Sequence, residues 1–132
     1  MNSIILAMMF SAATQKFDLP KGVLESLCFV ESGHKVNAVH EDDGNSDSLG
    51  ICQIKLETAR WMGFKGNERQ LMKPEVNIYY AAKYLSYQRS RYNGSVTKAI
   101  IAYNVGHAKN LNSTEYSDKV LTTWRTMYYA GK

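Results

Sequence analysis

Apolar residues recur every three or four positions along most of the 132-residue chain, which is the spacing of one face of an α-helix. Residues 3–15 are predicted to form a first helix around an apolar run at positions 4–10. A second helix is predicted to begin at Asp18 as its N-cap, with Pro20 in the first turn, and to end at Gly33. The N-terminal quarter of the chain is therefore expected to be helical.

The same spacing continues after residue 55. Helices are predicted at 56–62, at 74–92 and, with Ser95 as its N-cap, at 96–105. Each is ended by a glycine or by Asn93-Gly94, and a last helix is predicted to open at Asn112 or Ser113. The buried face of that last helix would carry Tyr116, Val120, Trp124 and Met127.

Residues 34–52 break the helical pattern because they are polar and rich in turn-forming residues. The expected fold class is therefore all-α, or α+β at most, with a polar loop or a small β-ribbon around residues 38–52. Because 132 residues suit one domain and no linker-like segment divides them, residues 1–132 are expected to form one domain.

Charge changes this picture little. The net charge of +4 is spread along the chain and favours a weak field over a dedicated nucleic-acid surface. Tyr80, Tyr84 and Tyr87 share one face of a predicted helix. Core is the favoured interpretation of these tyrosines, and a platform for sugars or bases stays open. A noncatalytic basic helical module that binds nucleic acid or a partner protein stays open as an alternative from another class.

The apolar run at positions 4–10 has no Lys or Arg before it and is too short to cross a bilayer. We therefore expect neither a signal peptide nor a transmembrane segment. Delivery by a phage particle, a lysis system or a secretion machine would then be needed to reach a substrate outside the cytoplasm.

Cys28 and Cys52 lie in segments that read as buried, without the short spacings of a zinc site. Free core thiols are the favoured interpretation, and a disulfide between the two stays open. Asp43, Asn45 and Asp47 alternate as in a calcium loop, but the rest of that pattern fails. No metal or cofactor is expected.

Glu31 departs from the pattern because it continues an apolar helical stripe formed by Leu24, Leu27 and Cys28. Burial disfavours a charged carboxylate, so the pKa of Glu31 should be raised. A carboxylic acid still protonated near neutral pH is what a glycosidase needs to protonate a leaving oxygen. The alternative is that Glu31 only caps the helix end or pairs with Lys35.

Four segments together resemble the soluble lytic transglycosylase (SLT) domain family of the lysozyme-like superfamily. They are Glu31-Ser32-Gly33, Gly50-Ile51-Cys52-Gln53-Ile54, Pro74 with Asn77-Ile78, and Ala102-Tyr103-Asn104-Val105-Gly106. The resemblance implies a helical lysozyme-like fold and cleavage of the β-1,4 bond between N-acetylmuramic acid and N-acetylglucosamine in peptidoglycan, with 1,6-anhydromuramic ends as products.

The resemblance makes Glu31 the sole catalytic acid and base. Gln53, Tyr103 and Asn104 would bind substrate around it, although structural support for Gln53 and helix-end packing for the other two stay open. The expected partner is peptidoglycan at the bacterial cell wall or in the periplasm, with no specific nucleic acid and a monomeric enzyme.

One departure from the family pattern concerns a substrate-contacting serine, which is missing here and which His40 or Ser48 would replace. A second departure is the longer and more acidic loop before Gly50, which leaves a hydrolytic muramidase open as an alternative. Asp42, Asp43 or Asp47 could position a water molecule, although Asp47 is one residue out of place, and a one-residue slip on a strand points a side chain to the opposite face.

Overall fold

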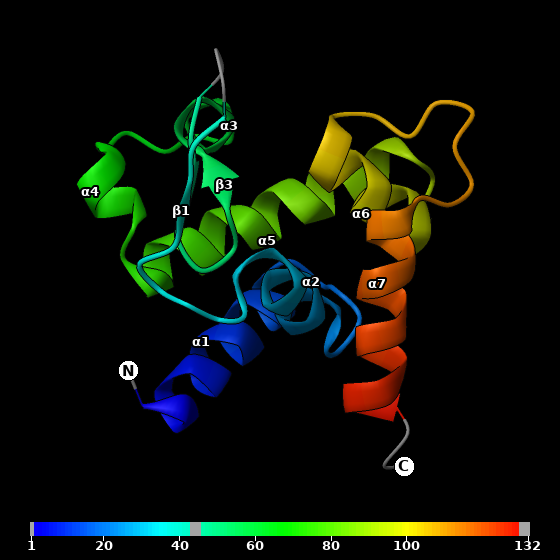
Figure 1. The fold of residues 1–132 in the computed structure, drawn as a ribbon, viewed down its shortest axis with the longest axis horizontal. Coiled ribbons are helices and arrows are strands. Elements are labelled where there is room, and N and C mark those ends of the chain that lie inside the picture. The colour runs from blue at the N-terminus through cyan, green and yellow to red at the C-terminus, as the bar shows by residue number, and fades with distance from the viewer. Residues whose placement is uncertain (1, 43–45, 130–132) are drawn as a thin grey trace.

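The protein is described by a computed structural model that covers residues 2–42 and 46–129 (Figure 1). Its helices are α1 (Ser3–Lys16), α2 (Val23–Ser32), α3 (Leu56–Trp61), α4 (Glu68–Leu71), α5 (Pro74–Arg91), α6 (Val96–Val105) and α7 (Glu115–Trp124), followed by a π-helical segment at Arg125–Tyr129. The strands are β1 (Val39–His40), β2 (Ser48–Leu49) and β3 (Ile54–Lys55). The predicted class, a helical fold with a small β-ribbon, is confirmed.

Two helices begin later than predicted, and the ends of α1, α3 and α5 differ by one residue. The second helix begins at Val23 with Gly22 as N-cap, because Asp18 adopts a left-handed conformation with φ of 51° and cannot start it. Helix α7 begins after Thr114, not after Asn112 or Ser113, because Thr114 and Ser117 form a reciprocal capping box. The first correction concerns backbone conformation and the second concerns local hydrogen bonding, and apolar spacing reports neither.

The predicted buried face of the last helix holds only in part. Val120 is fully buried and Tyr116 and Trp124 are half-buried, but Met127 is 52% exposed. Met127 lies in the π-helical segment, where the rotation per residue no longer keeps it on the face set by Val120. The prediction for Met127 is therefore wrong.

The strands form one antiparallel sheet in the order β1-β2-β3. Ser48 lies between two neighbours in register, opposite His40 on β1 and opposite Lys55 on β3. The third strand extends the ribbon beyond the predicted range of 38–52. A small apolar cluster joins Leu49 of β2 and Ile54 of β3 to Leu71 of α4.

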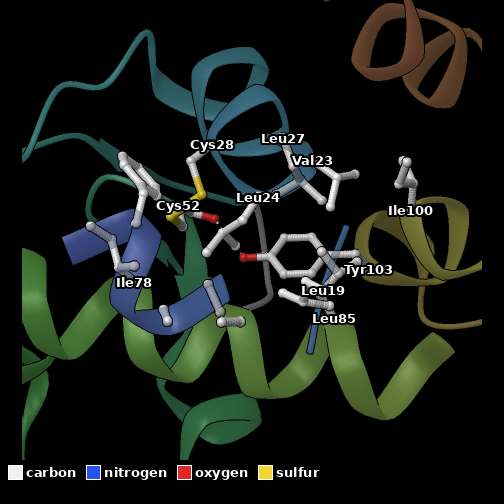
Figure 2. Close-up of a cluster of buried hydrophobic side chains, with 14 of the residues drawn as sticks. Leu19, Val23, Leu24, Leu27, Cys28, Cys52, Ile78, Leu85, Ile100 and Tyr103 are labelled. Carbon is white, nitrogen blue, oxygen red and sulfur yellow. Dashed lines mark hydrogen bonds between the residues drawn. A yellow bond between two sulfur atoms is a disulfide. The ribbon is translucent and has the colours of Figure 1, made fainter. Parts of the chain in front are cut away.

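The main core lies where α2 packs against α7 and where α5 packs against α1 and α6. Its buried members include Leu24, Leu27, Ile78 and Leu85, which lie between α2 and α5 in Figure 2, and Ile100 on α6. Helix α5 runs across the centre of the molecule (Figure 1), and α2 packs against α7 and α1. The helix that carries Glu31 is therefore held by packing against the core.

A disulfide joins Cys28 of α2 to Cys52 in the segment between β2 and β3 (Figure 2). The favoured sequence interpretation, two free thiols, is wrong. Both residues are fully buried as expected, but packing of α2 against the 50–53 segment brings together two positions 24 residues apart. The bond ties the helix of Glu31 to the segment that contains Gln53.

Asn77 on α5 holds the same segment in place. Its buried side-chain amide accepts from the Cys52 N–H at 2.8 Å and donates to the carbonyls of Leu49 at 2.8 Å and Leu71 at 3.0 Å. Gly50 packs directly on this amide with φ of +79°, and a Cβ atom there would lie 2.7 Å from Asn77 Cγ. Only glycine fits this contact in this conformation.

The tyrosines of α5 do not all belong to the core. Tyr80 and Tyr84 pack against the buried clusters as predicted, but Tyr87 is 38% exposed and packs edge-to-face on Trp61. The core prediction is therefore wrong for Tyr87. Across residues 2–42 and 46–129, no helix combines the length and the apolar character needed to cross a bilayer.

Candidate active site

Glu31 lies in the last turn of α2, immediately before Gly33 ends the helix in a left-handed conformation. Its partly buried side chain lines a cavity of about 320 Å³. The other lining residues come from the sheet, α3, α5 and the end of α6; they are Ser48, Gln53, Ile54, Lys55, Glu57, Thr58, Tyr84, Tyr103, Asn104, Val105 and Gly106.

A second cavity of about 390 Å³ adjoins the first and adds His40 and Asp42 to the lining. The two cavities share Glu31 and four other residues, so they form one continuous groove. The shared residues are Glu31, Ser48, Gln53, Lys55 and Asn104. All four predicted substrate-binding residues thus line the groove next to Glu31. We call these two joined cavities the Glu31 groove.

A hydrogen bond from α7 holds the Glu31 carboxyl. The Tyr116 hydroxyl donates to Glu31 Oε2 at 2.7 Å. Burial raises the pKa of Glu31 to about 7, and the Tyr116 hydrogen bond opposes that rise by stabilising the carboxylate. The pKa of Tyr116 is itself raised well above its usual range by burial, so its hydroxyl keeps its proton and remains a donor.

The predicted rise in the pKa of Glu31 is therefore confirmed, and the alternative roles are not. Within the part of the chain that the structure describes, the ion pairs join Lys55 to Asp42 and Lys119 to Glu115, and neither includes Glu31 or Lys35. The helix is ended by Gly33, whose N–H donates to the Phe29 carbonyl. Near neutral pH, Glu31 can hold a proton or release it.

Tyr103 lies beside Glu31 with its ring almost fully buried and 5.4 Å from that of Tyr84, measured between centroids. Its hydroxyl donates to the Cys52 carbonyl at 2.7 Å (Figure 2). That proton is therefore committed to the backbone of the disulfide segment. Asn104, the next residue on α6, is exposed along the groove.

Gln53 is buried and adopts a left-handed conformation with φ of 54°. Its side-chain Nε2 donates to the carbonyls of Ala38 at 3.1 Å and Gly50 at 2.9 Å. Both amide hydrogens thus support the loop, which favours the structural role that the sequence left open. The amide can still offer its oxygen to a ligand.

Both replacements for the missing serine lie at the groove. Ser48 and His40 face each other across β1 and β2, and both line the cavity that contains Asp42. Asp42 forms an ion pair with Lys55 at 3.5 Å. Asp47 lines neither cavity of the groove, and Asp43, like Asn45, lies outside the described residues.

Several residues in the groove or in contact with Glu31 had no assigned role in the site from the sequence. Tyr116 was read as core only, because its contact with Glu31 joins positions 85 residues apart. Lys55, Glu57 and Thr58 follow the Gln53 motif directly, so their proximity to the motif was the signal available. Within residues 2–42 and 46–129, no group of three metal-binding side chains gathers. The expectation that no metal is needed stays a prediction.

Comparisons with known proteins place this geometry in context. Protein IpgF of Shigella flexneri and that of Shigella sonnei are each 31% identical to the chain over 97 residues, which is 71% of this chain and 62% of each relative. The chain thus matches less than two thirds of these relatives' length. An inactive mutant of the lytic transglycosylase Slt from Pseudomonas aeruginosa has the same fold, with a TM-score of 0.76 at 20% identity over 92% of this chain and 23% of that one.

The family model described as transglycosylase SLT domain matches residues 8–123, which include all of α2, the sheet and the Glu31 groove. The chain belongs to the SLT transglycosylase domain family.

Proposed function

We propose that this chain is a peptidoglycan lytic transglycosylase in which Glu31 is the sole catalytic acid and base. The observation that carries the proposal is the Glu31 carboxyl itself, which lies in a groove with a pKa of about 7 and a hydrogen bond from Tyr116. Membership of the SLT family supports the reaction type.

In the first step, protonated Glu31 donates its proton to the oxygen that links C1 of N-acetylmuramic acid to C4 of N-acetylglucosamine. The C1–O bond then breaks, and the N-acetylglucosamine side leaves as an alcohol. The 2-acetamido group of the muramic residue stabilises the electron-poor C1, as in substrate-assisted glycosidases. A Glu with its pKa near neutrality suits this step because proton donation is most effective when the pKa matches the working pH.

In the second step, the Glu31 carboxylate takes the proton from the muramic C6 hydroxyl as that oxygen bonds to C1. A 1,6-anhydromuramic end forms, and Glu31 recovers its proton. One proton is given and one is returned, no water is consumed and no second protein carboxylate is required. The Tyr116 hydroxyl stabilises the carboxylate between the two steps.

Substrate binding is proposed for Ser48, Gln53, Tyr103 and Asn104, all of which line the groove beside Glu31. Ser48 and Asn104 are free to face the glycan, since neither is fully buried. Tyr103 and Gln53 act mainly by shaping the wall, because their own hydrogen atoms already bind backbone carbonyls.

The proposed partner is the glycan strand of peptidoglycan, and the proposed place of action is the bacterial cell wall. A single domain, a monomeric state and delivery by another assembly stay predictions.

Replacement of Glu31 by Gln tests the proposal directly, because it keeps the size of the side chain and removes the acid. Purified peptidoglycan should lose turbidity with the native chain and keep it with Glu31→Gln. The matched control is Glu25→Gln on the same helix. The pKa of Glu25 is also raised by burial, but Glu25 lines a different cavity, with Tyr128, so activity should persist. Lysis by Glu31→Gln would overturn the catalytic assignment.

A hydrolytic reaction would need a second carboxylate to position water. Among the described residues, Asp42 is the aspartate that lines the groove. Its ion pair with Lys55 ties it to the edge strand of the sheet. Under transglycosylation, Asp42→Asn and Asp47→Asn should each retain most activity. A severe loss in Asp42→Asn alone, accompanied by reducing ends, would support a muramidase instead.

A further inference from the structure

Two large aromatic side chains lie exposed beyond one end of the Glu31 groove. Trp61, the last residue of α3, is 62% exposed, and Tyr87 on α5 is 38% exposed. Their ring centroids are 4.8 Å apart with an interplanar angle of 88°. Each ring therefore fixes the orientation of the other while leaving apolar surface in water, which costs free energy unless a ligand covers it.

This aromatic pair is continuous with the groove. A cavity of about 260 Å³ lies against Trp61 and Tyr87, and it shares Glu57, Thr58, Tyr84 and Gly106 with the cavity that contains Glu31. Both α3 and the end of α6 line this cavity, so they border a common path. A linear polymer bound at Glu31 can thus reach the aromatic pair without leaving the protein surface.

The polar groups around the pair fit a sugar better than an apolar ligand. Glu57 and Thr58 offer a carboxylate and a hydroxyl, and Arg91 lines the same cavity. The Arg91 guanidinium is held by donation from Nη1 to the Gly106 carbonyl at 3.0 Å. A sugar ring presents apolar C–H groups on its faces and hydroxyls around its edge, so an aromatic face flanked by donors and acceptors matches both.

We propose that Trp61 and Tyr87 form a distal glycan-binding subsite, which holds an N-acetylhexosamine unit of the same strand that Glu31 cleaves. This inference rests on the proposed function because it assigns the ligand of the groove's extension. The subsite gives binding energy to longer strands and takes no part in proton transfer. Trp61 and Tyr87 are therefore specificity-determining residues.

Calorimetric titration of the Glu31→Gln protein with β-1,4-linked N-acetylglucosamine oligomers tests the subsite. The dimer and the hexamer are compared, because only the longer oligomer can occupy both the site at Glu31 and the aromatic pair. Trp61→Ala and Tyr87→Ala, each in this background, should reduce the affinity advantage of the hexamer over the dimer by about two- to tenfold. Trp61→Phe should restore part of it.

Tyr79→Ala is the matched control. Tyr79 is 36% exposed on the same helix and packs on Phe17, but it lines neither the Glu31 groove nor the extension. It should leave the hexamer advantage unchanged. An unchanged advantage in both Trp61→Ala and Tyr87→Ala would overturn the subsite. Failure of the proposed function is a different result, since the native chain would then bind the hexamer without cleaving peptidoglycan.

Discussion

The hydrogen bond from Tyr116 to Glu31 gives the sharpest test of how the site is tuned. Tyr116→Phe keeps the ring of a half-buried side chain and removes the hydroxyl that donates to Glu31 Oε2 at 2.7 Å. This hydroxyl lowers the pKa of Glu31 against the larger effect of burial. Its loss should therefore move the pKa of Glu31 above about 7.

The size of the shift follows from the energy of the bond. A hydrogen bond to a charged group contributes about 1.5–3 kcal/mol, and one pKa unit corresponds to about 1.36 kcal/mol. Glu31 borders a groove that water can enter, so water replaces part of the lost bond and the lower end applies. We expect a rise of about one pKa unit.

The assay is the rate of peptidoglycan cleavage from pH 5 to 9. Because Glu31 must be protonated to start the reaction, activity should fall as the pH rises through its pKa. At pH 8, a rise of one unit increases the protonated fraction from about one tenth to about one half, so the activity relative to pH 6 should increase about fivefold.

Tyr128→Phe is the control for Tyr116→Phe, because Tyr128 hydrogen-bonds Glu25 on the same helix but lies outside the Glu31 groove. The activity of Tyr128→Phe should fall over the same alkaline pH range as that of the native chain. If the alkaline fall in the activity of Tyr116→Phe stays at the native pH or moves to lower pH, the assignment of Glu31 as the acid is refuted.

Three further predictions concern stability. Ionisation of Glu31 destabilises the folded state relative to the unfolded state, because folding raises the pKa of this carboxyl from 4.5 to about 7. The cost is absent below pH 4.5, grows up to pH 7 and is complete above it, so Glu31→Gln should gain about 1–3 kcal/mol of unfolding free energy at pH 8 and nothing at pH 4. Equal gains at both pH values in urea titrations would contradict this. Cys52→Ser breaks a disulfide that spans 24 residues and should cost about 3 kcal/mol; a urea midpoint equal to that of the native chain would count against it. Gly50→Ala should cost about 3 kcal/mol and Gly94→Ala about 1 kcal/mol, because both have φ near +80 to +90° but only the first meets the Asn77 amide. Equal losses in thermal unfolding would show that the Asn77 contact does not matter.

Apolar spacing predicted the helices well because it records which face of each helix is buried. It placed α1, α5 and α6 within about two residues, and the helix-ending role of Gly33 is confirmed by its φ of 66°. It missed α4, which depends on a capping box between Asn67 and Gln70 and has little apolar face. Local hydrogen bonds of this kind leave a weak trace in an apolar pattern.

The catalytic role of Glu31 and the binding roles of Gln53, Tyr103 and Asn104 came from the resemblance to the SLT family, and the apolar pattern contributed one further signal. Glu31 stood out because a carboxylate on an apolar stripe is costly, and its raised pKa is confirmed. Contacts between distant segments left no such mark. The disulfide and the Tyr116 hydrogen bond both depend on how α2 packs against other elements, and Tyr87 looked like core because helical spacing does not tell a buried face from one that borders a groove.

The most direct test of the central claim is mass spectrometry of the fragments released from purified peptidoglycan. The account predicts new 1,6-anhydromuramic ends, which are absent when Glu31→Gln replaces the native chain. Reducing muramic ends would contradict it, because they require water as the nucleophile and a second group, such as Asp42, to position that water.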